Sequence, residues 1–221
     1  MQKNYYDVVI ATPGSNFESL YLHSLLKTIE RLAELGITYK FVNGTSSIVA
    51  VARERCLFPD LFNSGIGQDI FGGEFDCGKI FWIDSDMKWE PEDFLKLLDS
   101  DKDIISGTCL MGDNTQVPIF PRIGFSPLIK GAVIALPNIP HKIEACGMGF
   151  LAVSMSAMNR IEKPWFGDIK INLEENSGNI VEWFCNSEDI AFCQRAKIAG
   201  VEVWFDPSVR VGHVKKRLLT L

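Results

Sequence analysis

The sequence predicts an α/β protein with a doubly wound, mostly parallel central sheet and a few antiparallel strands. Apolar, β-branched runs alternate with amphipathic helical patterns as far as Gly107, which is typical of parallel sheets covered by helices. One run, from Lys79 to Asp84, is apolar on both faces, as expected of a central strand. The chain has 221 residues, of which 47% are hydrophobic. We therefore expect one domain over residues 1–221.

Helix signals lie between the apolar runs of the first half. Ser15 followed by Glu18 forms a capping-box pattern ahead of a long helix. A second helix is expected to open at Ser46 or the next serine, and a third carries Pro91 in its first turn. The glycine-rich stretch 63–78 is predicted to be a loop or an insertion. The predicted strands of this half are 5–11, 37–42, 79–84 and 103–107.

The second half is predicted to be less regular. Residues 111–127 are rich in glycine, proline and polar side chains, and a loop of this length is typical of a functional segment. A helix over 187–199 ends at Gly200. The glycines at 147 and 149 interrupt one of the strands, and antiparallel pairing is expected here. The predicted strands are 129–136, 144–153, 201–205 and 209–215.

Composition excludes several classes of protein. The 28 acidic residues outnumber the 22 basic ones, giving a net charge of −6 that argues against nucleic acid as a partner. No apolar run approaches the roughly 18 residues of a membrane span, and the polar start resembles no signal peptide. The six cysteines have no metal-like spacing, so we expect reduced, mostly buried thiols in a cytoplasmic protein without a transmembrane segment.

The triplet Asp84-Ser85-Asp86 follows the predicted central strand directly. Ligands of open parallel sheets bind at the carboxyl ends of the strands. Side chains two residues apart in an extended chain point to the same side, so both carboxylates can face one cation or nucleotide. Charges placed after four apolar residues must reach water, a ligand or a metal, because burying them unpaired is costly. The alternative is that Asp86 caps the helix that starts at Pro91.

Five motifs in this order resemble GT-A-fold glycosyltransferases, specifically family-2-like enzymes and their small phage or bacterial relatives. The resemblance spans Asp7 to Lys215 and implies a nucleotide-binding half over 1–108 and an acceptor and catalytic half over 109–221. The motifs are the strand ending in Thr12-Pro13, the Ser-x-x-x-x-Ala-Arg that ends at Arg53, Asp84-Ser85-Asp86, Gly147-Met148-Gly149-Phe150 and the helix start Glu188-Asp189.

The resemblance implies a nucleotide pocket and a metal site. Arg53 is expected to reach the nucleotide or its diphosphate, with a solvated position on the helix surface as the alternative. Imidazole beside carboxylate suits Mn²⁺, whereas Mg²⁺ prefers oxygen ligands alone. The implied metal ligands are Asp84, Asp86 and His213, where Asp84 holds the metal through water or binds the ribose. The implied nucleotide-binding residues are Thr12, Pro13, Arg53, Asp84 and Ser85.

The catalytic residues implied by the resemblance open the last helix. Asp189 is expected to be the base, with Glu188 beside it on the acceptor side. The alternative is that both acids only favour helix initiation, since anions are stabilised in a first turn. Gly147 and Gly149 are expected to lie beneath the donor sugar and the acceptor, or else to form a simple strand bulge. Trp183 is expected to stack on a sugar ring.

The expected reaction is transfer of a sugar from a nucleotide-diphosphate donor, most simply a UDP-sugar, to a hydroxyl of a glycan or another acceptor. Transfer with inversion would use Asp189 as base. Two alternatives remain open. A sugar-nucleotide nucleotidyltransferase usually carries a lysine in a glycine-rich loop after the first strand, and Thr12-Pro13-Gly14 is followed by none. A non-catalytic module that binds nucleotide sugars or glycans would show binding without transfer.

Overall fold

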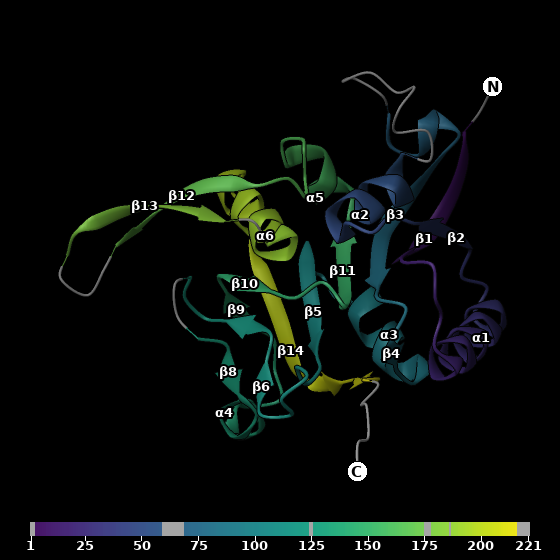
Figure 1. Cartoon of the computed structure of the whole chain (residues 1–221). Coiled ribbons are helices and arrows are strands. Elements are labelled where there is room, and N and C mark those ends of the chain that lie inside the picture. The colour runs from purple at the N-terminus through teal and green to yellow at the C-terminus, as the bar shows by residue number, and fades with distance from the viewer. Residues whose placement is uncertain (1–2, 59–68, 124–125, 175–177, 186, 216–221) are drawn as a thin grey trace, which may run out of the picture.

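A seven-stranded mixed sheet forms the centre of the protein, which we describe from a computed structural model covering residues 3–58, 69–123, 126–174, 178–185 and 187–215 (Figure 1). Five strands run in one direction, and β11 and β9 run against them. The mostly parallel α/β architecture predicted from the sequence is therefore confirmed. In sheet order the strands are β2 (Tyr39–Gly44), β1 (Asn4–Pro13), β3 (Phe75–Ile83), β11 (Phe150–Ser154), β5 (Ile104–Thr108), β14 (Val203–Arg210) and β9 (His141–Ile143).

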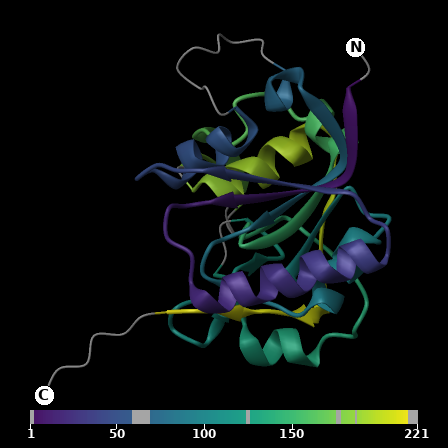
Figure 2. The same ribbon diagram turned by 90° about the vertical axis from the view of Figure 1, so that its right-hand side faces the viewer.

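Helices cover both faces of the sheet (Figure 2). Alternate side chains of β1 divide between two hydrophobic cores, because successive residues of a strand point to opposite faces. Val8 and Ile10 pack in the core beneath α1 (Ser19–Glu34) and α3 (Pro91–Leu98). Val9 and Ala11 pack in the core on the other face. That second core is covered by α2 (Val49–Leu57), α5 (Met155–Arg160) and α6 (Glu188–Ile198).

Smaller elements surround the sheet. The hairpin of β12 (Ile169–Glu174) and β13 (Ile180–Cys185) extends away from the body of the molecule (Figure 1). Short ladders pair β4 (Met87–Lys88) with β15 (Gly212–His213), β10 (Ala145–Cys146) with β7 (Ile119–Phe120), and β6 (Gln116–Val117) with β8 (Leu128–Ile129). The remaining elements are the 3₁₀ turn η1 (Ile70–Gly73) and α4 (Lys130–Ala135).

Several sequence-based boundaries were wrong. The predicted strand 129–136 is mostly the helix α4, because a short apolar run fits a helix as well as a strand. The predicted capping box at Ser15 does not form, since α1 begins at Ser19 with Glu18 at its cap position. β3 starts at Phe75, inside the predicted loop 63–78, of which residues 63–68 lie outside the described part. β14 runs from the predicted strand 201–205 through to the start of the predicted strand 209–215, of which residues 212–213 form the separate strand β15.

Two further expectations concern the cysteines and the membrane. All six cysteines are free thiols, and five are buried while Cys109 is half-buried. Within the described residues, the helices are too short or too polar to traverse a lipid bilayer.

Candidate functional site

The site begins where β1 and β3 end side by side. These strands pair in parallel with Ala11 opposite Trp82, so Thr12 and Asp84 follow at neighbouring strand ends, as predicted. The loops that follow also touch. A Cβ atom on Gly14, whose φ is +122°, would lie 3.0 Å from Ser85 Oγ, and the Ser85 carbonyl accepts a hydrogen bond from the Glu18 backbone N–H at 3.0 Å. Only glycine fits this approach without strain.

Arg53 lies at the centre of an acidic cluster, although it comes from helix α2. Its side chain is 2% exposed, so the alternative of a solvated helix residue is wrong. Arg53 Nη2 donates to Asp84 Oδ1 at 3.1 Å, and Nε donates to Glu188 Oε1 at 3.4 Å. Burial alone would lower the pKa of Arg53, but Asp84, Glu188 and Asp189 outweigh it and raise that pKa above its usual value. The guanidinium therefore stays charged and joins β3 to α6.

One nitrogen of this guanidinium makes no hydrogen bond to a described residue. Arg53 Nη1 is buried and has no hydrogen-bond partner among the described residues. Leaving a buried donor unpaired is costly, so such an atom requires an explanation. An anionic ligand at this point would satisfy it, since guanidinium groups bind carboxylate and phosphate oxygens well.

The start of helix α6 brings two more carboxylates to the cluster. Burial raises the pKa of Glu188, and the charge of Arg53 partly offsets this rise. Asp189 Oδ1 accepts hydrogen bonds from Ser187 Oγ and from the Ile190 backbone N–H, so this oxygen takes part in the first turn of the helix. A Cβ atom on Gly147 would lie 3.7 Å from Asp189 Oδ2. The second oxygen of Asp189 thus lies near Gly147, the residue that follows β10.

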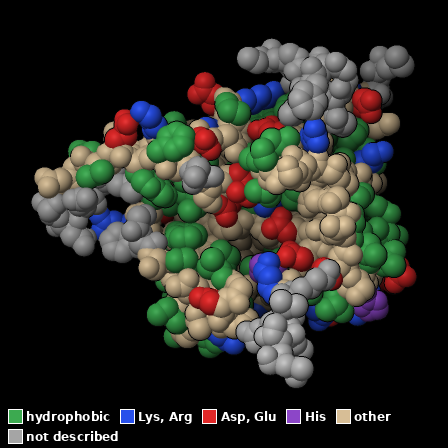
Figure 3. Space-filling view, viewed as in Figure 1, with side chains coloured by type: hydrophobic (Ala, Val, Ile, Leu, Met, Phe, Trp, Pro, Cys, Tyr) green, Lys and Arg blue, Asp and Glu red, His purple; other side chains and the backbone are tan. Residues whose placement is uncertain are grey.

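Gly149 plays the corresponding part beside Asp84. Its carbonyl accepts a hydrogen bond from the Asp84 backbone N–H at 3.0 Å, and a Cβ atom on Gly149 would lie 3.3 Å from Asp84 Oδ2. Gly149 therefore allows the backbone to approach the Asp84 carboxylate closely. At Gly147 the tightest contact of an added Cβ atom would be with Pro118, at 3.1 Å, so this glycine also fits the alternative of a structural bulge. Figure 3 shows acidic side chains gathered in the middle of this face.

Asp86 forms a second cluster with the C-terminal segment. Its Oδ2 lies 3.1 Å from His213 Nε2 and 3.0 Å from Lys215 Nζ, and the Leu110 carbonyl lies 3.0 Å from His213 Nδ1. Burial would raise the pKa of Asp86, but the hydrogen bonds from His213 and Lys215 lower it to about 2. The hydrogen bond with Asp86, helped by one with Cys109, raises the pKa of His213 to about 10.

The structure therefore brings together only two of the three predicted metal ligands. Asp86 and His213 meet directly, whereas Asp84 pairs with Arg53. Over the part of the chain that the structure describes, no three His, Cys, Asp or Glu side chains form a group that could hold a metal ion. The donors of the Asp86–His213 pair, one carboxylate and one imidazole, nevertheless fit Mn²⁺ chemically if phosphate oxygens or water complete the coordination. Helix α3 is capped by Glu90, so the expected alternative of Asp86 as its cap is wrong.

Three other predicted site residues lie outside the Arg53 and Asp86 clusters. Thr12 is fully buried and its hydroxyl lies 2.5 Å from the Tyr21 hydroxyl, and Pro13 is buried at the end of β1. Trp183 lies on the projecting hairpin, opposite Ile171 of β12, and is 38% exposed. The sequence did not indicate Lys215 as a site residue. Its spacing of two from His213 was the available signal, because side chains two residues apart lie on the same side of an extended segment.

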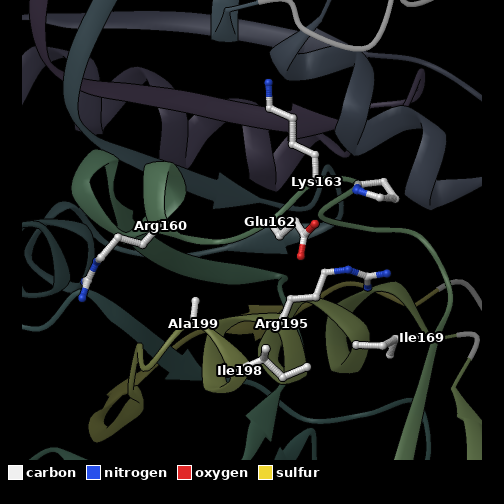
Figure 4. Close-up of a pocket in the computed structure, with 8 residues that line it drawn as sticks. Arg160, Glu162, Lys163, Ile169, Arg195, Ile198 and Ala199 are labelled. Carbon is white, nitrogen blue, oxygen red and sulfur yellow. The ribbon is translucent and has the colours of Figure 1, made fainter.

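A separate cavity of about 360 Å³ lies between α5, α6 and β12. Figure 4 shows Glu162 and Arg195 facing one another at its centre, while Arg160 and Lys163 point outward. Arg195 donates to the Gly167 and Asp168 carbonyls, so it braces the loop ahead of β12. The residues lining this cavity do not include the carboxylates of the candidate site.

Comparison with known proteins identifies the fold. No protein-family model and no curated protein sequence matches the chain. Among the solved structures that match along almost all of it are two with TM-scores above 0.5. A197 from STIV is 15% identical with a TM-score of 0.51, covering 100% of this chain and 98% of that one. GalNAc-T7 with UDP, GalNAc and Mn²⁺ is 11% identical with a TM-score of 0.53, covering 97% of this chain.

A third match, the inositol-1-phosphate CTP transferase from T. maritima, is 8% identical with a TM-score of 0.42 and covers 96% of this chain. The chain spans only 44% of the length of GalNAc-T7. The seven-stranded sheet and the similarity to the two structures with TM-scores of 0.51 and 0.53 define a mixed α/β fold of the GT-A type. At such low identities the similarity concerns the fold alone.

Proposed function

We propose that this protein is a metal-dependent glycosyltransferase that moves a sugar from a nucleotide-diphosphate donor, most simply a UDP-sugar, to a hydroxyl acceptor. One observation carries the proposal. A buried arginine joins Asp84, at the end of the central strand β3, to Glu188, beside Asp189 at the start of α6, and no described residue pairs with its Nη1. This arrangement lies at the carboxyl edge of the sheet, where ligands of such folds bind.

The donor would lie over the ends of β1 and β3. Arg53 Nη1 would donate to an oxygen of the nucleotide or its diphosphate, which would satisfy its buried N–H groups. Asp84 would accept from the ribose hydroxyls through Oδ2, since Oδ1 is held by Arg53. Ser85 and the Gly14 loop would border the nucleotide.

Asp86 and His213 would hold a divalent cation, Mn²⁺ by donor chemistry or Mg²⁺. When bound, such a cation would supply positive charge against the diphosphate leaving group. To bind it, His213 would have to give up the proton at Nε2 that now pairs with Asp86. The similarity to a GT-A structure that contains UDP and Mn²⁺ supports this assignment.

Asp189 would take the proton of the acceptor hydroxyl in an inverting transfer. Its Oδ1 is occupied by the helix start, so Oδ2, beside Gly147, would receive the proton. Glu188 would remain paired with Arg53 and hold the start of α6 in place. The proton would thus move to the Asp189 oxygen that lies near Gly147.

Calorimetric titration with UDP and a panel of nucleotide sugars, with and without Mn²⁺, tests the proposal. We expect UDP binding that depends on Mn²⁺ and is lost in Asp86→Ala and His213→Ala. Asp101→Ala is the matched control, because Asp101 is an exposed carboxylate that pairs with its neighbour Lys102. Unchanged Mn²⁺-dependent binding in both site variants would rule out this metal site. Binding without transfer to any acceptor would favour a non-catalytic module.

A further inference from the structure

Lys215 occupies a defined position beside Asp86. The Val214 backbone N–H donates to the Asp86 carbonyl at 2.8 Å, and His213 pairs with Met87 in the β15–β4 ladder. The backbone just before Lys215 is therefore fixed against the residues around Asp86. Lys215 Nζ reaches the same oxygen, Oδ2, that His213 contacts.

This position would bring Lys215 into competition with any metal ion. A carboxylate oxygen that accepts from an ammonium group cannot at the same time be fully available to a divalent cation. The Lys215 side chain is 50% exposed and flexible, so it can leave Asp86 without disturbing the core. An ammonium released here remains next to the place where the donor's diphosphate would lie.

We propose that Lys215 is a resident counter-cation of Asp86, which gives way to a divalent cation and then pairs with the diphosphate of the donor. This inference rests on the proposed function and adds to it a residue that contacts the leaving group. No bond is made or broken in the exchange, since one cation replaces another at a carboxylate. The ligand chemistry is that of a nucleoside diphosphate with a divalent metal ion.

The test uses Lys215→Met and the matched control Lys88→Met. Lys88 lies opposite Gly212 in the β4–β15 ladder, pairs with Glu90 at 3.2 Å and is 45% exposed, so its loss changes the same charge in the same region. Mn²⁺ binding to the nucleotide-free protein is measured from the electron paramagnetic resonance signal of free Mn²⁺. UDP affinity is measured by calorimetry at saturating Mn²⁺.

We expect Lys215→Met to bind Mn²⁺ about two- to fivefold more tightly than the wild type, the scale of one exposed ion pair. We expect its UDP affinity to fall by about tenfold, the scale of one hydrogen bond to a charged group. Lys88→Met should match the wild type in both, and Lys215→Arg should restore most of the UDP affinity.

Three results would overturn the inference in different ways. Unchanged Mn²⁺ affinity in Lys215→Met would refute the competition at Asp86. A gain in Mn²⁺ affinity with unchanged UDP affinity would refute the transfer to the diphosphate. A wild type that binds neither Mn²⁺ nor UDP would refute the proposed function itself, and this inference with it.

Discussion

Arg53 Nη2 lies 3.1 Å from Asp84 Oδ1, although the arginine comes from helix α2 and the aspartate from the end of β3. The same guanidinium also reaches Glu188 on α6. The three elements are thereby held by one buried cation, and its removal leaves two carboxylates without their partner. Arg53 is therefore a structural residue, and the proposed function gives it ligand binding as a second role.

Arg53→Met should destabilise the protein by about 3 kcal/mol, the lower part of the range for breaking a buried ion pair. The lower part applies because Asp84 keeps 33% of its side chain exposed. Urea denaturation measures the change. The control is Arg31→Met, an exposed arginine paired with Glu34, which should cost less than about 1 kcal/mol. Equal effects of the two variants would contradict the buried role of Arg53.

Asp189→Asn should reduce sugar transfer by about 100-fold or more, the scale of losing a general base. UDP affinity should stay near the wild-type value, because the amide keeps the shape and the hydrogen bond from Ile190. Transfer rate and calorimetry on one preparation give both quantities. Near-normal transfer would assign Asp189 to helix initiation and would favour a retaining mechanism.

Gly149→Ala should weaken UDP binding. The new Cβ atom would lie 3.3 Å from Asp84 Oδ2 and 3.4 Å from Met87 Sδ, so Asp84 would have to shift. The control is Gly131→Ala in helix α4, where a Cβ atom meets nothing within 4 Å. That control should raise the melting temperature slightly, since alanine favours helix by about 1 kcal/mol. Wild-type UDP affinity in Gly149→Ala would show that Asp84 tolerates the displacement.

The pair of Asp86 and His213 should make folding stability depend on pH. The pKa of Asp86 is lowered from 3.8 to about 2. The stability that ionised Asp86 adds to the fold is therefore present above pH 3.8 and lost as pH falls through 2. The pKa of His213 is raised from 6.5 to about 10. The stability that protonated His213 adds to the fold is therefore present below pH 6.5 and lost as pH rises through 10.

The free energy of unfolding should therefore differ most between the wild type and His213→Asn from pH 3.8 to 6.5. The difference should disappear above pH 10. Urea denaturation across this range measures it in the absence of metal. A difference that stays constant from pH 5 to 10 would show that the charge of His213 does not stabilise the fold.

Local sequence patterns predicted the central strand β3 and the interruption between β10 and β11, both of which border the candidate site. The two-sided apolar run before Asp84 identified β3, and the glycine interruption at 147–149 marked the boundary between β10 and β11. The six residues of α4 are too few for their hydrophobic pattern to distinguish a helix from a strand, so the prediction of a strand was wrong. Element type follows from local sequence only where the periodic run is long.

Contacts between distant segments could not be predicted in the same way. The burial of Arg53 depends on Asp84 and Glu188, which are 31 and 135 residues away. The contact of Lys215 with Asp86 depends on the pairing of β15 with β4. Trp183 was chosen for its aromatic ring alone, and nothing local indicated that it lies on a projecting hairpin. The role of Trp183 in sugar binding stays a prediction.

The position of β11 has a consequence for how the chain reaches its folded state. β5 borders only β11 and β14, and both are made later in synthesis than β5 itself. A nascent chain ending at residue 108 can pair β2, β1 and β3, but its β5 has no neighbouring strand. The sheet closes only when residues 150–154 insert between β3 and β5. The two halves of the chain therefore complete one another, and we expect them to unfold in a single cooperative transition.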